Sequence, residues 1–151
     1  MKLSFFSLAS GSSGNCYYLG TPDFGILIDA GISFRTIKKV LKDNNIDISK
    51  IAAVLVTHDH ADHIKTVGYL GEKMYLPIYS TADVHRGIDN SRYVEETLNG
   101  SRRIIQKEVP FMIRDFSIVA FEVPHDSTDN VGYHICYKEH KFTFATDVGH
   151  I

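Results

Sequence analysis

Disulfide staples, zinc-binding cysteine pairs and membrane-spanning runs are all missing from this chain. The only cysteines are Cys16 and Cys136, and no Cys-x-x-Cys spacing occurs. We therefore expect both to be buried thiols of a reducing compartment. No apolar run reaches the roughly 18 residues that cross a membrane, and the amino-terminal segment is too short and too interrupted for a signal peptide. These absences predict a cytoplasmic protein without a membrane partner.

A large excess of charge of one sign is also missing. Sixteen Lys and Arg residues oppose eighteen Asp and Glu residues, so the net charge is -2. No general positive field would draw the whole molecule to nucleic acid, and a phosphate-bearing substrate would need a local site. Hydrophobic residues make up 44% and charged residues 23% of the 151 residues, which excludes a disordered, collagen-like or coiled-coil chain. The length fits one domain whose core needs no staple.

Strand-like runs and helical patterns alternate along the chain. Three extended runs joined by turn residues open the sequence and predict an antiparallel meander. Ser33 is a candidate N-cap for an amphipathic helix that ends at Asn44, and the apolar run 51–56 predicts a strand covered on both faces. Further helices are expected at 64–74 and 82–88, and further strands at 77–80, 116–123, 131–137 and 141–145. The pattern favours a mixed sheet with helices packed on one face.

Histidine, which occurs eight times, is concentrated in the segment THDHADH at residues 57–63. Alternate residues of an extended backbone point the same way, so His58, His60 and Asp62 would project together from the end of the preceding strand. His63 would begin the following helix and turn toward a second, adjacent ion. Such a pattern should arise by chance in only about two chains in a thousand. A polar loop whose histidines merely cap the helix is the less favoured interpretation.

Three other residues with metal-ligand chemistry lie where strands are expected to end. They are Asp29, His125 and Asp147. Gly31, two residues after Asp29, would allow close backbone approach at that point. An isolated His or Asp at a strand end is usually a turn-former, and the neighbouring histidine motif makes a role in the site the favoured interpretation.

These motifs resemble those of the metallo-β-lactamase-fold hydrolases. The order His-x-His-x-Asp-His at 58–63 matches the signature loop of that family, and the three strand-end residues match its other motif positions in chain order. The opening SLASGSSGNC at residues 7–16 is similar to the YycJ/WalJ branch, whose members are described as metal-dependent hydrolases with exonuclease-type activity. The resemblance implies an α+β fold, an αββα sandwich of mixed, largely antiparallel sheets with helices on the outer faces.

The resemblance also implies a set of metal ligands. By this analogy His58, His60 and His125 hold the first ion, Asp62 and His63 hold the second, and Asp147 bridges both. Asp29 would orient the ligand loop from behind. Asp62 and Asp29 are therefore the two carboxylates to which a catalytic role is assigned.

The donor types favour two divalent ions, with Zn²⁺ as the first choice and Mn²⁺ or Fe as alternatives. Two ions roughly 3.5–4 Å apart can lower the pKa of a bridging water and supply hydroxide at neutral pH, so no serine or cysteine nucleophile is needed. The predicted function is a phosphodiesterase or exonuclease that acts on nucleic acid or a small phosphoester. Hydrolysis of a thioester or a lactam is the alternative, because the same hydroxide can attack a carbonyl.

One departure from the family concerns the carboxyl-terminal end. Members usually carry a further histidine for the second ion in a C-terminal half-domain, whereas this sequence ends four residues after Asp147, and His150 lies too close to take that role. We therefore expect one domain over 1–151 that lacks its C-terminal part, with a second site that can be weak or empty. A metal-binding but catalytically deficient fragment, able to self-associate through the surface left bare, is a further alternative.

Two weaker signals concern substrate contacts. The loop at 11–15 is rich in Gly and Ser, and its backbone N–H groups could converge on a phosphate oxygen, with Ser12, Ser13 and Asn15 as candidate contacts; a plain turn is the alternative. A basic cluster of Arg102, Arg103, Lys107 and Arg114 could contact a nucleic-acid backbone, but a solvated face is the default interpretation.

Overall fold

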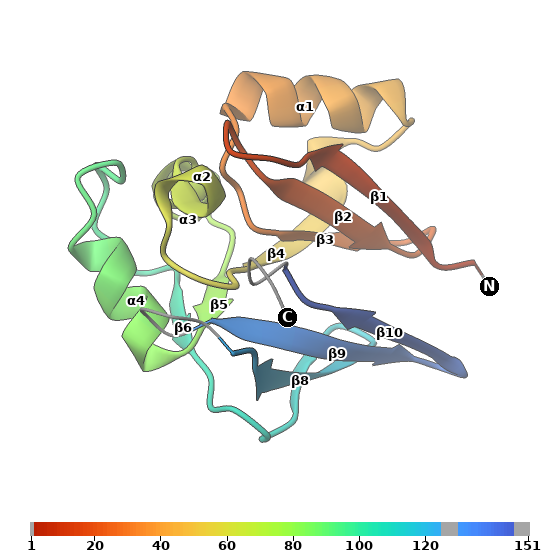
Figure 1. Cartoon of the computed structure of the whole chain (residues 1–151). Coiled ribbons are helices and arrows are strands. Elements are labelled where there is room, and N and C mark those ends of the chain that lie inside the picture. The colour runs from red at the N-terminus through yellow and green to blue at the C-terminus, as the bar shows by residue number, and fades with distance from the viewer. Residues whose placement is uncertain (1, 125–129, 147–151) are drawn as a thin grey trace.

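Two β-sheets face each other in the computed structural model, which describes residues 2–124 and 130–146. The larger sheet contains, in spatial order, β1 (Ser4–Ala9), β2 (Cys16–Gly20), β3 (Gly25–Ile28), β4 (Ile51–Leu55), β5 (Ile78–Ser80) and β6 (Arg102–Ile104). The smaller sheet contains β10 (His140–Phe144), β9 (Val131–Tyr137), β8 (Phe116–Glu122) and β7 (Phe111–Ile113) in that order. Figure 1 shows the two sheets as the upper and lower layers of a sandwich.

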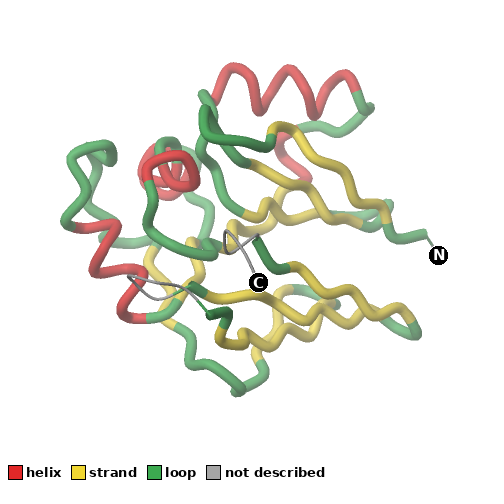
Figure 2. The backbone as a smooth tube through the Cα atoms, viewed as in Figure 1, coloured by secondary structure: helices red, strands yellow, loops and turns green. Residues whose placement is uncertain are grey.

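Helices cover the outer face of the larger sheet. They are α1 (Phe34–Asp43), α2 (Ala61–Ile64), α3 (Val67–Glu72) and α4 (Ala82–Asp89), with a short 3-10 helix η1 (Ile48–Lys50) before β4. In Figure 2 these helices, drawn in red, all lie on the side of the larger sheet that faces away from the smaller one. The mixed α+β sandwich expected from the sequence is therefore confirmed.

Strand direction changes within the larger sheet. The strands β1, β2 and β3 form the expected antiparallel meander, and β3, β4, β5 and β6 run parallel to one another. Parallel neighbours place their carboxyl ends at the same rim of a sheet, and open α/β sheets bind their ligands at that rim. The segments that follow β3 and β4 are the ones that contain Asp29 and the histidine loop.

Side chains of β3 and β4 alternate between two apolar cores, which explains why both strands are continuous hydrophobic runs. Ile26, Ile28 and Leu55 belong to the core between the sheets, together with Phe116 and Ile135 of the smaller sheet. The other face packs against the helices in a second core that contains Leu27, Val54, Ile37, Leu41 and Leu70. The strand predicted at 51–56 is confirmed as β4.

The helix expected after Ser33 is confirmed as α1. The Ser33 hydroxyl accepts a hydrogen bond from the Thr36 N–H at 3.1 Å, and the chain leaves the helix at Asn44. Ile37 and Leu41 are fully buried beneath it. The helix and its loop carry the chain from the end of β3 to the start of β4, which fixes these two strands as parallel neighbours.

The single helix expected at 64–74 is instead two short helices, α2 and α3. The break lies at Thr66, whose N–H donates to the Ala30 carbonyl and whose hydroxyl donates to the Ile32 carbonyl. Tertiary contacts to the segment after β3 thus replace continuous helical bonding. His63 consequently lies inside α2, which begins at Ala61, rather than at the start of a helix. The strands β6 and β7, three residues each, were not expected from the sequence.

Both cysteines are free, in agreement with the sequence. Cys16 is completely buried, and its burial raises the pKa of the thiol far above the ordinary value. Cys136, by contrast, is only partly buried, so the expectation of two buried thiols is wrong at this position. Its strand β9 alternates between the inner core and the outer face of the smaller sheet, and Cys136 is on the outer face. Within the described ranges no helix has the length and apolar character needed to cross a membrane.

His85 on α4 fastens the edge of the larger sheet. Its Nε2 lies 3.1 Å from the Ile78 carbonyl oxygen and 3.0 Å from that of Arg103, so Nε2 must carry the proton and donate to β5 and β6. The Nδ1 atom is buried and has no partner among the described residues. Burial therefore lowers the pKa of His85, and the positive charge of Arg102 acts in the same direction.

Acidification should therefore destabilise the metal-free chain through His85. Because the folded-state pKa is depressed, the stability that neutral His85 contributes is present above about pH 6.5 and is lost as the pH falls toward the folded-state pKa. Urea unfolding of the wild type and His85→Gln at about pH 7.5 and 5.5 measures this contribution. We expect the wild type to lose more unfolding free energy on acidification than the variant does. Equal losses in both proteins would contradict the assignment.

Candidate metal centre

The histidine loop lies at the rim where β3 and β4 end, and backbone bonds hold it there. The Asn15 N–H donates to the Asp62 carbonyl at 2.8 Å, and the Ala30 N–H donates to the His63 carbonyl at 2.8 Å. Gly31 lies directly against this stretch, because a Cβ added to it would fall within 3.0 Å of the Asp62 carbonyl oxygen. The close backbone approach predicted at Gly31 is confirmed.

Contacts from the smaller sheet hold the loop from the other side. The Tyr133 hydroxyl donates to the Val56 carbonyl at 2.7 Å, and the Val131 N–H donates to the Thr57 carbonyl at 2.9 Å. The Ser80 hydroxyl of β5 also donates to the Val56 carbonyl at 2.7 Å. Both sheets therefore anchor the residues that precede the first histidine.

Three imidazole rings of the loop gather at this rim. The ring centroids of His58 and His60 are 4.5 Å apart, and those of His58 and His63 are 4.0 Å apart. The formation of an apolar core does not explain a cluster of three imidazoles, whereas zinc sites commonly contain several histidine ligands. His58 and His63 are buried and His60 is exposed, so the cluster opens outward at one side.

Asp29 organises this cluster from below. Its Oδ1 accepts the Thr57 N–H at 2.8 Å, and its Oδ2 accepts the Thr57 hydroxyl at 2.7 Å. The same Oδ2 lies 2.6 Å from His63 Nδ1. Asp29 itself has a φ of 64°, a left-handed conformation that aspartate tolerates better than most residues. Asp29 directly follows β3, and this left-handed backbone conformation ends the strand at the position from which the carboxylate contacts the histidine loop.

Asp29, His58 and His63 offer ligand atoms that all lie within 4.8 Å of one another and could hold a metal ion. The Asp29 carboxylate, however, is completely buried and already accepts three hydrogen bonds. A metal ion at this carboxylate would compete with those bonds, each of which satisfies a buried donor. Its geometry fits the orienting role implied by the family resemblance, and its burial keeps it from direct contact with a substrate.

Asp62 and His63 lie side by side at the mouth of the cluster. Asp62 Oδ2 is 3.7 Å from His63 Nε2, close to the roughly 3.4 Å that separates two ligands of one tetrahedral zinc ion. Burial alone would lower the pKa of His63, but the hydrogen bond to Asp29 and the charges of Asp29 and Asp62 outweigh this effect and raise it. The Asp62 carboxylate and the His63 imidazole are donor types that suit a divalent cation.

A cleft of about 450 Å³ opens beside these two residues. It is lined by Ser10, Gly11, Asn15, Tyr17, Asp62, His63, Phe144, Ala145 and Thr146. The candidate substrate contacts in the 11–15 loop differ in position: Ser12 and Ser13 are exposed, whereas Asn15 is buried. The Asn15 amide donates to Asp62 Oδ2 at 3.0 Å and to the Gly11 carbonyl at 2.8 Å. Asn15 thus links the loop to a candidate metal ligand.

The remaining candidate ligands lie outside the described residues, namely His125 and Asp147, as does His150. Their roles stay predictions. Of the described residues, Asn130 precedes β9 and Thr146 follows β10, and the Thr146 hydroxyl lies 3.5 Å from Asn130 Oδ1. Val131, next to Asn130, donates to Thr57 as described above, which places this end of the smaller sheet against the histidine loop.

The basic cluster does not line the cleft. Each of its members already has a neighbour: Arg102 pairs with Asp89 at 2.8 Å, Arg103 donates to the Gly100 carbonyl, Lys107 lies 3.6 Å from Glu122, and Arg114 lies over the Phe24 ring. These contacts agree with the default interpretation of a solvated face.

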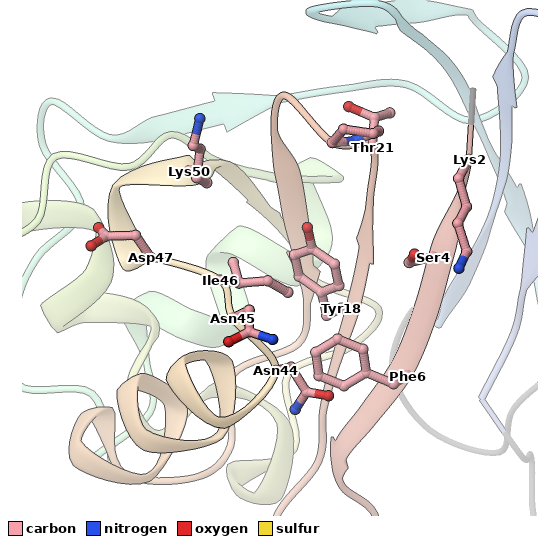
Figure 3. A pocket seen from close by; sticks show the side chains of 11 residues that line it. Lys2, Ser4, Phe6, Tyr18, Thr21, Asn44, Asn45, Ile46, Asp47 and Lys50 are labelled. Atoms are coloured by element: carbon pink, nitrogen blue, oxygen red, sulfur yellow. The ribbon is translucent and has the colours of Figure 1, made fainter.

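A second cavity, of about 430 Å³, lies at the opposite end of the larger sheet, between the start of β1 and the end of α1 (Figure 3). Its labelled side chains include Lys2, Tyr18, Asn44 and Lys50, and among the described residues that line it Asp47 alone has a carboxylate. It therefore lacks the ligand chemistry of the histidine rim.

Thr57, which joins Asp29 to the histidine loop by two hydrogen bonds, was not among the site residues predicted from the sequence. The one available signal was its position directly before the first histidine, at the end of a buried strand. A threonine there has no chemistry of its own, so its role became visible only when Asp29, 28 residues earlier, was placed beside it.

A family model described as "Beta-lactamase superfamily domain" matches residues 25–151. Two curated relatives have similar sequences. One is the exodeoxyribonuclease WalJ of Streptococcus pneumoniae, 33% identical over 144 residues, which are 95% of this chain and 54% of the relative. The other is the exodeoxyribonuclease YycJ of Bacillus anthracis, 30% identical over 151 residues, 100% of this chain and 56% of the relative. The chain thus spans about half the length of these relatives.

Solved structures agree on the fold. A subclass B3 metallo-β-lactamase of Bradyrhizobium japonicum superposes with a TM-score of 0.71 at 15% identity, over 87% of this chain and 55% of that one. At this level of identity the likeness establishes the arrangement of strands and helices and leaves the substrate open.

Proposed function

Because the chain belongs to the beta-lactamase superfamily, we propose that it is a metal-dependent hydrolase that cleaves phosphodiester bonds in DNA. The observation that carries this proposal is the cluster of His58, His60 and His63 beside the buried Asp29 carboxylate, with His63 lining a cleft. The two relatives described above, at 33% and 30% identity over nearly the whole chain, are named exodeoxyribonucleases, which favours DNA over a lactam or a thioester.

Zinc is the ion we propose, and Mn²⁺ or Fe would suit the same donors less specifically. His58 and His60 would belong to the first ion and Asp62 and His63 to the second, with His125 and Asp147 completing the set. Divalent ions held there would act as Lewis acids and would lower the pKa of bound water.

The chain's own groups supply position and charge. Asp29 and Thr57 hold His58 and His63 in fixed orientations, and the Asn15 amide holds Asp62. The cleft beside Asp62 and His63 gives a phosphodiester access to this end of the site. The exposed serines of the adjoining 11–15 loop, Ser12 and Ser13, are proposed to donate hydrogen bonds to a phosphate oxygen.

The direct test is release of nucleotides from end-labelled DNA by the purified chain, with Zn²⁺ or Mn²⁺ added. We expect metal-stimulated release by the wild type and a loss of at least about 100-fold in His60→Ala, because a ligand of the site is removed. His140→Ala is the matched control, since His140 is an exposed residue of β10 far from the loop in sequence, and it should retain wild-type activity.

Parallel assays with a thioester and a lactam substrate separate the alternatives. Turnover of either without nucleotide release would overturn the choice of substrate. Metal binding without turnover of any of the three would instead favour the catalytically deficient form. Self-association stays a separate prediction, for which light scattering at increasing protein concentration is the measurement.

A further inference from the structure

The hydrogen bonds around Thr57 and Asp29 indicate which ring nitrogens of His58 and His63 carry protons. The Thr57 hydroxyl oxygen lies 2.7 Å from Asp29 Oδ2 and 2.9 Å from His58 Nδ1. A hydroxyl has one proton, and an ionised carboxylate can only accept. The hydroxyl proton therefore points to Asp29, and the hydroxyl oxygen must accept a hydrogen bond from a protonated His58 Nδ1.

The consequence for His58 is a defined tautomer. With the proton on Nδ1, the lone pair of the neutral ring is on Nε2, and a metal ion can bind only through a lone pair. His63 has the same tautomer through a direct hydrogen bond, because its Nδ1 lies 2.6 Å from Asp29 Oδ2 and donates to it. The buried Asp29 carboxylate thus determines the tautomers of two histidines, that of His63 directly and that of His58 through Thr57.

We propose that Thr57 is a positioning residue whose hydroxyl connects the Asp29 carboxylate to His58 by two hydrogen bonds. This relay fixes the His58 imidazole as its Nδ1–H tautomer, which can bind a metal through Nε2. The relay explains why Thr57 is completely buried and anchored on three sides: its N–H and hydroxyl both donate to Asp29, and its carbonyl accepts from Val131. With these three bonds in place, the hydroxyl cannot turn away from His58 without losing a buried partner.

The proposal concerns the metal ligands and does not depend on which bond the protein hydrolyses. Its first test uses the metal-free wild-type chain. Long-range ¹H–¹⁵N correlation spectra of the imidazole rings distinguish protonated from unprotonated nitrogens, and the His58→Gln spectrum identifies the His58 signals. We expect His58 to be protonated at Nδ1 and unprotonated at Nε2. The opposite tautomer in the wild type would overturn the proposal without any other variant.

The second test compares two substitutions of Thr57. Thr57→Val keeps the shape and removes the hydroxyl, so the Nδ1–H preference of His58 should be lost and zinc affinity should fall about 10–100-fold in competition with a chromophoric chelator. Thr57→Ser keeps the hydroxyl and should preserve the wild-type tautomer, with zinc affinity within about 3-fold. A Thr57→Val protein with wild-type tautomer and affinity would contradict the relay.

Thr66→Val is the matched control. It also removes a threonine hydroxyl bond near the loop, the one from Thr66 to the Ile32 carbonyl, but Thr66 has no bond to a histidine or to Asp29 in the described structure. We expect it to lower stability and to leave the His58 tautomer unchanged. If Thr66→Val shifted the tautomer as much as Thr57→Val, the effect would be general loosening of the loop, and the specific relay would be wrong. Nucleotide release enters neither test, so failure here is distinct from failure of the DNA-cleaving assignment.

Discussion

Replacing Asp29 by asparagine is expected to lower the zinc affinity of the chain by about 10–100-fold. The amide oxygen can still accept from the Thr57 N–H, but the amide nitrogen would face the Thr57 hydroxyl and His63 Nδ1, which both donate to Oδ2 in the native chain. The amide N–H group would then face two other donors, the Thr57 hydroxyl and His63 Nδ1–H, with no acceptor between them. His63 must therefore change tautomer or rotate away. Competition with a chromophoric chelator measures the affinity directly.

The control for this change is Asp43→Asn. Asp43 is an exposed residue of α1 that pairs with Lys39 at 2.9 Å, and its loss alters the net charge by the same amount far from the histidine rim. We expect its zinc affinity to match the wild type. Equal affinities for Asp29→Asn and Asp43→Asn would mean that the buried carboxylate does not orient the ligands.

Gly31→Ala is expected to destabilise the chain by about 1–3 kcal/mol, because the added methyl group would overlap the backbone of the histidine loop. The obstruction is the Asp62 carbonyl and the His63 N–H group, and backbone cannot move aside as a flexible side chain can. The loop must therefore shift, and zinc affinity should fall together with stability. Urea unfolding and chelator competition measure the two effects on one protein.

Gly100→Ala provides the comparison for this substitution. No atom lies within 4 Å of a Cβ added at Gly100, and its backbone has no positive φ. An alanine there should be neutral or slightly stabilising, since it reduces the freedom of the unfolded chain. If Gly31→Ala were as stable as Gly100→Ala and bound zinc normally, the close contact between Gly31 and the loop would contribute nothing to the free energy of unfolding or to zinc binding.

Features governed by local sequence pattern were predictable. The antiparallel meander and α1 follow from turn residues, an N-cap at Ser33 and apolar spacing, all of which act within a few residues. The position of His58 and His60 side by side after β4 also follows from a strand that ends at one rim of a sheet. Asp62, which was expected to continue the same extended run, lies instead in α2, where it contacts His63.

Features governed by long-range contacts were not predictable. The break between α2 and α3 depends on bonds from Thr66 to the segment after β3, more than 30 residues earlier. The edge strand β6 has a polar sequence and owes its place partly to His85, which donates to the Arg103 carbonyl. The role of Thr57 likewise required Asp29 to be placed beneath it. In each case the decisive partner is distant in the sequence and has no motif of its own.

Metal content per chain, measured by elemental analysis after dialysis against zinc, tests the central claim most directly. The claim is that the histidine loop over Asp29 is a metal centre. It predicts one or two zinc ions per wild-type chain, and loss of at least one ion in the double variant His58→Ala, His60→Ala. Two ions would mean that the Asp62 and His63 side is also filled. A wild-type chain without stoichiometric zinc, or a double variant with undiminished zinc, would contradict the claim.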